Sequence, residues 1–178
     1  MNASMSEGSE AGSIRYLGSA VPVYFGSFIH EFRYANWTLS FNMRYKLGYY
    51  FRKSSIGYTG LVNNGIGHAD YSKRWQQPGD HTDVPAFEYP LVTPNRDDFY
   101  LGSEIHLKKA DHVRLQYLNI GYRFQNNRKN QLWKSASLNI NASNLGILWR
   151  ANKDGIDPDY VESISPSKQL SLGIKLML

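Results

Sequence analysis

The segment WTLSFNMRYKLGYYF, residues 37–51, most constrains the fold. Its odd positions are apolar from Trp37 to Tyr49, and its even positions are small or polar from Thr38 to Gly48. A period of two over 13 residues predicts a β-strand, because a helix would scatter the same residues around its circumference. Soluble strands average about five or six residues, whereas a tilted membrane-spanning strand needs about nine to eleven.

Four further segments show strand patterns, at 23–34, 112–124, 137–149 and 168–178. Ala35 and Asn36 alone separate the first two strands, which predicts a tight hairpin. The turn at 125–133 is also short, while the loops at 52–110 and 150–167 are long. The alternation slips near Asn144, where we expect a bulge or a strand end. We therefore predict an all-β, antiparallel up-and-down meander of about five long strands.

Two fold hypotheses share this pattern, because a soluble sheet with one buried face alternates in the same way. The strand lengths favour a membrane barrel, as do the aromatic residues at the ends of the apolar stripes, which are typical of membrane interfaces. Predicted lipid-facing residues are Trp37, Leu39, Phe41, Met43, Tyr45, Leu170, Leu172, Ile174, Leu176 and Leu178. Predicted lumen-facing residues are Glu31, Arg33, Arg44, Lys46 and Asn139.

Charge and composition restrict the functional classes. The net charge is +5 and the pI about 9.3, but the basic residues are dispersed, which makes nucleic-acid binding the weakest hypothesis. The chain has no cysteine, which excludes a disulfide framework and thiolate metal sites. Residues 1–13 are small and polar, and we expect a disordered or truncated loop there.

No catalytic motif is apparent, so we predict neither an enzyme nor a cofactor or metal site. His68 with Asp70, and Asp80 with His81, are more typical of solvated loop residues than of metal ligands. Asp157-Pro158-Asp159 lacks the spaced ligands of a calcium loop and predicts a turn. The long loop 52–110 is predicted to be either functional or disordered. We also expect short strands near Glu104–Leu107 within this loop. Its aromatic residues are candidate contacts for a substrate or a lid protein: Tyr58, Tyr71, Trp75, Phe87 and Tyr89.

Three segments resemble one protein family in the order that the family shows. They are YLGSAVPVYFGSFIHEFRYANWTLSFNMRYKLGYYF at 16–51, KKADHVRLQYLNIGYRF at 108–124 and SLNINASNLGILWRANKDGIDPDY at 137–160. Together with the last strand, they resemble the C-terminal barrel region of SusC/RagA-type TonB-linked outer-membrane proteins. The resemblance covers residues 14–178.

This resemblance implies a fold and a role. Family members form a plugged barrel of about 22 strands in the outer membrane of Gram-negative, Bacteroidetes-like bacteria. A SusD-like lipoprotein covers the mouth, and TonB supplies the energy to import oligosaccharides or peptides. The sequence contains neither plug nor TonB segment, so we expect a barrel fragment that does not transport alone. The alternative hypothesis is a soluble β-sheet carbohydrate-binding module.

Overall fold

The computed structural model describes residues 16–125 and 133–177. Predictions for residues 1–13, for Leu178 and for most of the turn at 125–133 lie outside the described residues. None of the described helices is long and apolar enough to cross a membrane.

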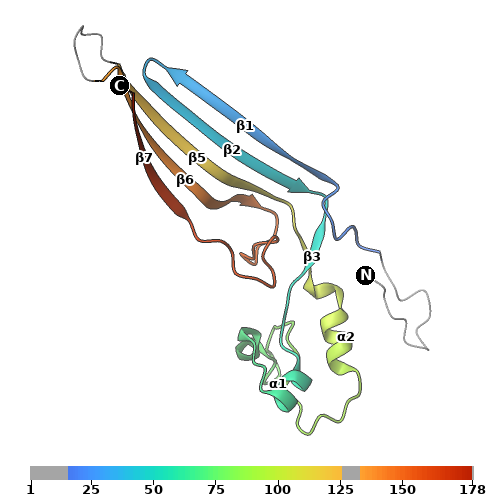
Figure 1. Cartoon of the computed structure of the whole chain (residues 1–178). Coiled ribbons are helices and arrows are strands. Elements are labelled where there is room, and N and C mark those ends of the chain that lie inside the picture. Colours follow the sequence, from blue (N-terminus) through green and yellow to red (C-terminus); the bar gives the residue numbers. More distant parts are fainter. Residues whose placement is uncertain (1–15, 126–132, 178) are drawn as a thin grey trace.

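One five-stranded antiparallel sheet dominates the fold (Figure 1). Its strand order is β1-β2-β5-β6-β7, so neighbours in the sheet follow one another along the chain apart from the small ribbon β3-β4. This confirms the predicted all-β meander. The strands are β1 (Tyr24–Tyr34), β2 (Trp37–Leu47), β5 (His112–Gln125), β6 (Ser135–Arg150) and β7 (Gln169–Met177).

The first two strands form the predicted hairpin. Tyr34 pairs with Trp37, which leaves a two-residue turn at Ala35 and Asn36. Ala35 has a φ of 50°, a value that an L-residue with a Cβ atom adopts at a cost. Hairpin turns with positive φ at the first central residue favour glycine there.

The register places most of the apolar residues of the five strands on one face, with Phe25 and Ile29 of β1 on the other. One row across the sheet runs Tyr34, Trp37, Tyr122, Leu138 and Ile174. The Trp37 and Tyr122 ring centroids lie 4.7 Å apart in an edge-to-face contact. We call this side the apolar face, and it carries every described residue predicted to face lipid.

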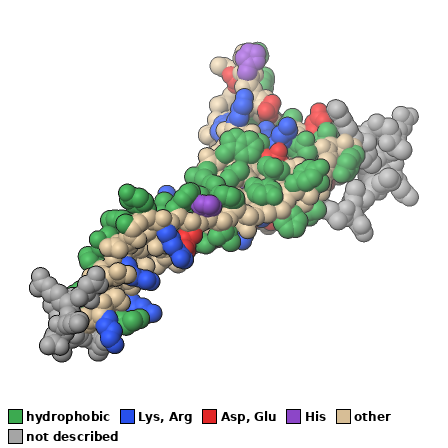
Figure 2. Space-filling view, turned by 90° about the horizontal axis from the view of Figure 1, so that it is seen from above, with side chains coloured by type: hydrophobic (Ala, Val, Ile, Leu, Met, Phe, Trp, Pro, Cys, Tyr) green, Lys and Arg blue, Asp and Glu red, His purple; other side chains and the backbone are tan. Residues whose placement is uncertain are grey.

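The apolar face is open over much of its area. Phe32 is 52% exposed and Leu170 is 77% exposed. Hydrophobic side chains lie along the length of the sheet in the space-filling view (Figure 2). The five-stranded sheet is therefore a single layer rather than half of a two-layer sandwich. Its apolar residues are not buried in a core between layers.

Bulges interrupt the alternation in two strands. Met43 pairs with Leu115 and Asn42 with Tyr117, so Gln116 is an extra residue in β5. The register between β5 and β6 shifts at the same level, and Asn144 takes a φ of 55°. The predicted slip near Asn144 is confirmed. Because a one-residue shift exchanges the two faces of a strand, His112 and Arg114 lie opposite the apolar face.

The excursion between β2 and β5, residues 48–111, is folded, and we call it the insert. Gly48 has a φ of 76° and ends β2, so the single strand predicted over 37–51 is divided into β2 and β3 (Tyr50–Arg52). Tyr49 is consequently buried rather than part of the apolar face. β3 pairs with β4 (Leu107–Lys109), close to the short strand expected near Glu104–Leu107.

The insert has a small core of its own. Ile56, Tyr58, Val84 and Tyr100 are buried together. Two helices and two short 3-10 turns surround them: α1 (Tyr58–Asn64), η2 (Ala69–Lys73), α2 (Arg96–Gly102) and η3 (Glu104–His106). Of the two predictions for this region, disorder is wrong, because these apolar residues bury one another.

Replacing Ala35 with glycine should stabilise the sheet. Glycine adopts positive φ without the Cβ penalty, so Ala35→Gly is expected to raise the free energy of unfolding by about 1 kcal/mol. Urea titration in detergent measures it. Ala136→Gly, within β6, is the control and should lower the same quantity. If both substitutions changed the free energy of unfolding equally, the interpretation that the turn at Ala35 is strained would be contradicted.

Candidate functional site

The side of the sheet opposite the apolar face is polar. One row across it contains Glu31, Ser40, Asn119, Asn141 and Ser171. The Asn119 amide donates a hydrogen bond to the Asn141 side chain. We call this side the polar face. The five residues predicted to face a lumen all lie on it in the register: Glu31, Arg33, Arg44, Lys46 and Asn139.

The loop between β6 and β7, residues 151–168, folds onto one end of the polar face. Asp159 Oδ1 accepts a hydrogen bond from Lys46 Nζ at 2.6 Å. Asp159 Oδ2 lies 3.4 Å from both His112 Nε2 and Arg114 Nη2. One carboxylate of this loop, which we call the second loop, thus contacts two neighbouring strands.

A second carboxylate in the same turn binds Arg114. Arg114 Nη2 donates to Asp157 Oδ1 at 2.5 Å and to Oδ2 at 2.7 Å, and the guanidinium lies 5.5 Å from the Tyr160 ring centroid. Asp157 Oδ1 also accepts from the Asp159 backbone N–H at 3.1 Å. The predicted turn at Asp157-Pro158-Asp159 is confirmed, and it presents two carboxylates to the sheet.

His112 lies fully buried beneath these contacts. Its Nδ1 is 2.9 Å from the Ala110 carbonyl, which can only accept, so Nδ1 carries the proton. The Tyr49 hydroxyl lies 3.4 Å from the same nitrogen. Burial raises the pKa of Tyr49, and the negative charges of Asp159 and Asp111 raise it further. The Tyr49 phenol is therefore neutral and serves in packing.

The electrostatics of Asp159 depend on its cationic neighbours. Burial alone would raise the pKa of its carboxyl group, but the hydrogen bond and charge of Lys46, with the other positive groups, hold the pKa below its ordinary value of 3.8. Asp159 is therefore ionised at neutral pH. The ionised form is the one that attaches the second loop to the sheet.

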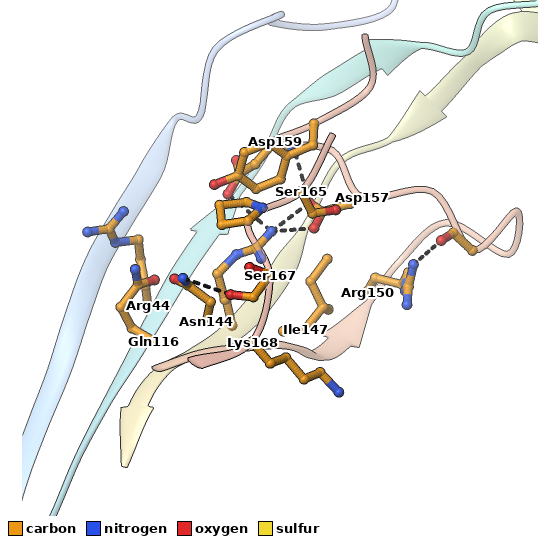
Figure 3. A pocket seen from close by; sticks show the side chains of 15 residues that line it. Arg44, Gln116, Asn144, Ile147, Arg150, Asp157, Asp159, Ser165, Ser167 and Lys168 are labelled. Atoms are coloured by element: carbon orange, nitrogen blue, oxygen red, sulfur yellow. Dashed lines mark hydrogen bonds and ion pairs between the residues drawn. The ribbon is translucent and has the colours of Figure 1, made fainter. Parts of the chain in front are cut away.

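A cavity of about 520 Å³ lies between the second loop and the polar face (Figure 3). Arg44 and Gln116 lie on one side of it and Asp157 and Asp159 on another. Its lining is mainly polar. The basic residues that line it are Arg44, Arg114, Arg150 and Lys168.

Polar contacts also attach the insert to the rest of the chain. The backbone N–H of Ala151 in the second loop donates to the Asp111 carbonyl at 2.9 Å. Asp154 of the second loop lies 3.6 Å from Lys53 and 4.0 Å from Lys108. The second loop therefore contacts both the sheet and the ribbon that carries the insert.

The aromatic residues predicted as contacts differ in accessibility. Tyr58 is 1% exposed and donates to the Pro85 carbonyl at 2.6 Å, so it packs the core of the insert and is removed from the candidate contacts. Tyr71 packs against that core, with the Arg74 guanidinium 4.1 Å from its ring centroid. Tyr89 is 74% exposed and stacks on Phe87. Trp75 is also exposed.

The histidine-aspartate pairs have local structural contacts. His68 Nδ1 accepts from the Asp70 backbone N–H at 3.1 Å at the start of η2. Asp80 accepts from the backbone N–H groups of Gln76 and Gln77. Across residues 16–125 and 133–177, no group of three or more metal-binding side chains is found.

Sequence reasoning missed four residues of the site: His112, Arg114, Asp157 and Asp159. The bulge at Gln116 moves the first two onto the polar face, and simple alternation from Leu118 places them on the other side. The repeated aspartates were visible, but a carboxylate pair in a turn does not identify its partner 113 residues away.

Comparison with known proteins gives a consistent picture, although no family model matches the chain. The TonB-dependent receptor P39 of Formosa agariphila is 24% identical over 147 residues, which is 80% of this chain and 14% of that protein. The RagAB peptide importer in its open-open state matches with a TM-score of 0.62 and 21% identity, over 92% of this chain and 18% of that chain.

The resemblance to SusC/RagA-type TonB-dependent receptors is confirmed. Another structure, of the RagAB peptide transporter, matches 96% of this chain with a TM-score of 0.62 and 21% identity. The chain spans less than one fifth of the length of these relatives, at 14% of the curated receptor and 19% of the RagAB chain. The likeness to these structures concerns the fold.

Removing the Asp159 charge should release the second loop. Asp159→Asn leaves Lys46 without its ion pair, a loss of roughly 1–3 kcal/mol. We expect amide hydrogen exchange over residues 157–160 to quicken by about tenfold or more. Glu162→Gln is the matched control, because the side chain of this exposed loop residue makes no hydrogen bond or ion pair within the described residues. Unchanged exchange in Asp159→Asn would show that the ion pairs do not hold the loop.

Acid should release the same loop. Because the pKa of Asp159 is lowered by folding, its stabilising contribution is present above the ordinary value of 3.8 and is lost as pH falls through the lower folded value. Spin labels on cysteines introduced at Ser27 and Glu162 should report a narrow distance distribution at neutral pH and a broad one near pH 2. Asp159→Asn should be broad at both, and a narrow distribution at low pH would contradict the assignment.

Proposed function

We propose that this chain forms part of the wall of an outer-membrane β-barrel that imports nutrients. The exposed apolar face carries the proposal. A soluble sheet gains its stability by burying such a face, whereas lipid covers the outside of a membrane barrel. The alternative, a soluble carbohydrate-binding module, would need a second layer over residues such as Phe32 and Leu170, which are exposed in this fold.

Strand length and aromatic placement support the same proposal. The five strands of the sheet contain 9 to 16 residues, which suits a tilted crossing of the hydrocarbon layer. Tyr34, Trp37, Tyr122 and Phe124 gather on the apolar face toward the hairpin end. In a barrel they would form part of an interfacial aromatic girdle, with the residues predicted to face lipid between the two interfaces.

The loops suggest the orientation. Both the insert and the second loop leave the sheet at the end opposite the Ala35-Asn36 turn. Bacterial barrels have short periplasmic turns and longer extracellular loops, so we place the insert at the extracellular mouth. The polar face then lines the lumen, with Glu31, Arg33, Arg44, Lys46 and Asn139 toward water, a plug or a passing solute.

The mouth is where partners would bind. The exposed rings of Trp75, Phe87 and Tyr89, with Tyr71 beside them, offer apolar contacts to a solute or a SusD-like lipoprotein. The RagAB relatives are described as peptide importers or transporters. We propose that the receptor carrying this chain imports peptides or oligosaccharides with energy from TonB. The role is one of transport rather than catalysis.

Two adjacent substitutions in β7 test the membrane orientation. Leu172 lies on the apolar face and Ser171 on the polar face, at neighbouring positions. An arginine facing lipid at mid-membrane costs about 2–4 kcal/mol, so Leu172→Arg should reduce insertion of the full-length protein into lipid vesicles. Ser171→Arg adds the same charge toward water and should insert normally. Heat-modifiable mobility on gels measures insertion, and equal behaviour of the two variants would refute the proposal.

A further inference from the structure

Two rows of basic residues cross the polar face beneath the second loop. Arg44 of β2 lies directly opposite Arg114 of β5. In the next row on the same face, Lys46 lies opposite His112, and His112 opposite Arg150 of β6. Like charges at directly opposed positions, such as Arg44 and Arg114, destabilise a sheet, so this pair requires neutralising anions.

The second loop supplies only part of that negative charge. Asp157 binds Arg114, and Asp159 binds Lys46. The Arg150 guanidinium donates to the Gly155 carbonyl, which carries no full charge. The Arg44 side chain makes no hydrogen bond or ion pair within the described parts of the chain. Its guanidinium points away from the two carboxylates (Figure 3).

The cavity beside these residues has unused polar groups. Arg44, Arg114 and Arg150 line it, together with Gln116. Among the described residues, the buried donor Arg114 Nε and the buried acceptor Gln116 Oε1 have no hydrogen-bond partner, and of the two only the donor suits a carboxylate. Buried polar atoms without partners are costly and are rarely left so in a native state. At about 520 Å³ the cavity has room for part of a small solute.

We propose that this cavity binds a carboxylate group of a solute, with Arg44 as the residue that contacts it. Arg114 already binds the carboxylate of Asp157, which shows that this face suits that group. A planar guanidinium matches a carboxylate through paired hydrogen bonds. The inference rests on the proposed transport function and specifies its substrate class as acidic, whether an acidic peptide or an acidic sugar.

Calorimetric titration of the full-length protein in detergent tests this inference. The probes are tri-glutamate with tri-glutamine as its neutral counterpart, and tri-galacturonate with neutral galactotriose. We expect at least one acidic probe to bind about tenfold or more tightly than its counterpart. Binding of one acidic probe identifies the source of the carboxylate, and binding of both shows that the carboxylate alone is recognised.

Matched variants locate the site. Arg44→Gln should abolish the preference for the acidic probe. Arg123→Gln removes the same charge from the same face, near the hairpin end and away from the cavity, and should leave the preference unchanged. Unaltered melting temperatures confirm that both variants fold.

Two results would overturn the inference. One is equal affinity of the wild-type protein for acidic and neutral probes. This result overturns the inference also where Arg44→Gln lowers the melting temperature, because an anion from another part of the protein then neutralises Arg44. The other is an equal loss in both variants. Failure of the transport proposal is separate, since it is detected as normal membrane insertion of Leu172→Arg.

Discussion

Antiparallel backbone pairing from β1 to β7 determines which side chains share a face. Side chains alternate between the two faces of the sheet along each strand. The pairing of Trp37 with Tyr122, and of Tyr122 with Leu138, therefore determines on which face the neighbouring side chains lie. A slip of one position would exchange apolar and polar residues along a whole strand. Both the open apolar face and the charged site on the other side depend on this register.

The bulge at Gln116 shows how the same constraint can be used locally. One extra residue in β5 leaves Leu118 and Ile120 on the apolar face and moves Arg114 and His112 to the polar face. Those two residues then meet the carboxylates of the second loop. An irregularity in strand pairing thus creates an electrostatic site within an otherwise regular sheet.

The sequence predicted what depends on local periodicity and missed what depends on distant contacts. Alternation in WTLSFNMRYKL was sufficient to predict β2, its faces and the hairpin before it. It could not predict the attachment of Asp159 to Lys46, because no local pattern links residues so far apart. Tyr58 illustrates the other limit: an aromatic residue in a long loop has the same sequence appearance whether it is exposed or forms the core of the insert.

The insert is nearly independent of the five-stranded sheet. The core residues Ile56, Tyr58, Val84 and Tyr100 contact one another rather than the five-stranded sheet. The insert is attached to the rest of the chain through polar contacts such as the hydrogen bond from the Ala151 backbone N–H to the Asp111 carbonyl. Mutations at its surface therefore leave the strand register unaffected. A protein built in this way can exchange the insert by recombination and acquire new recognition properties while it keeps the same five-stranded sheet.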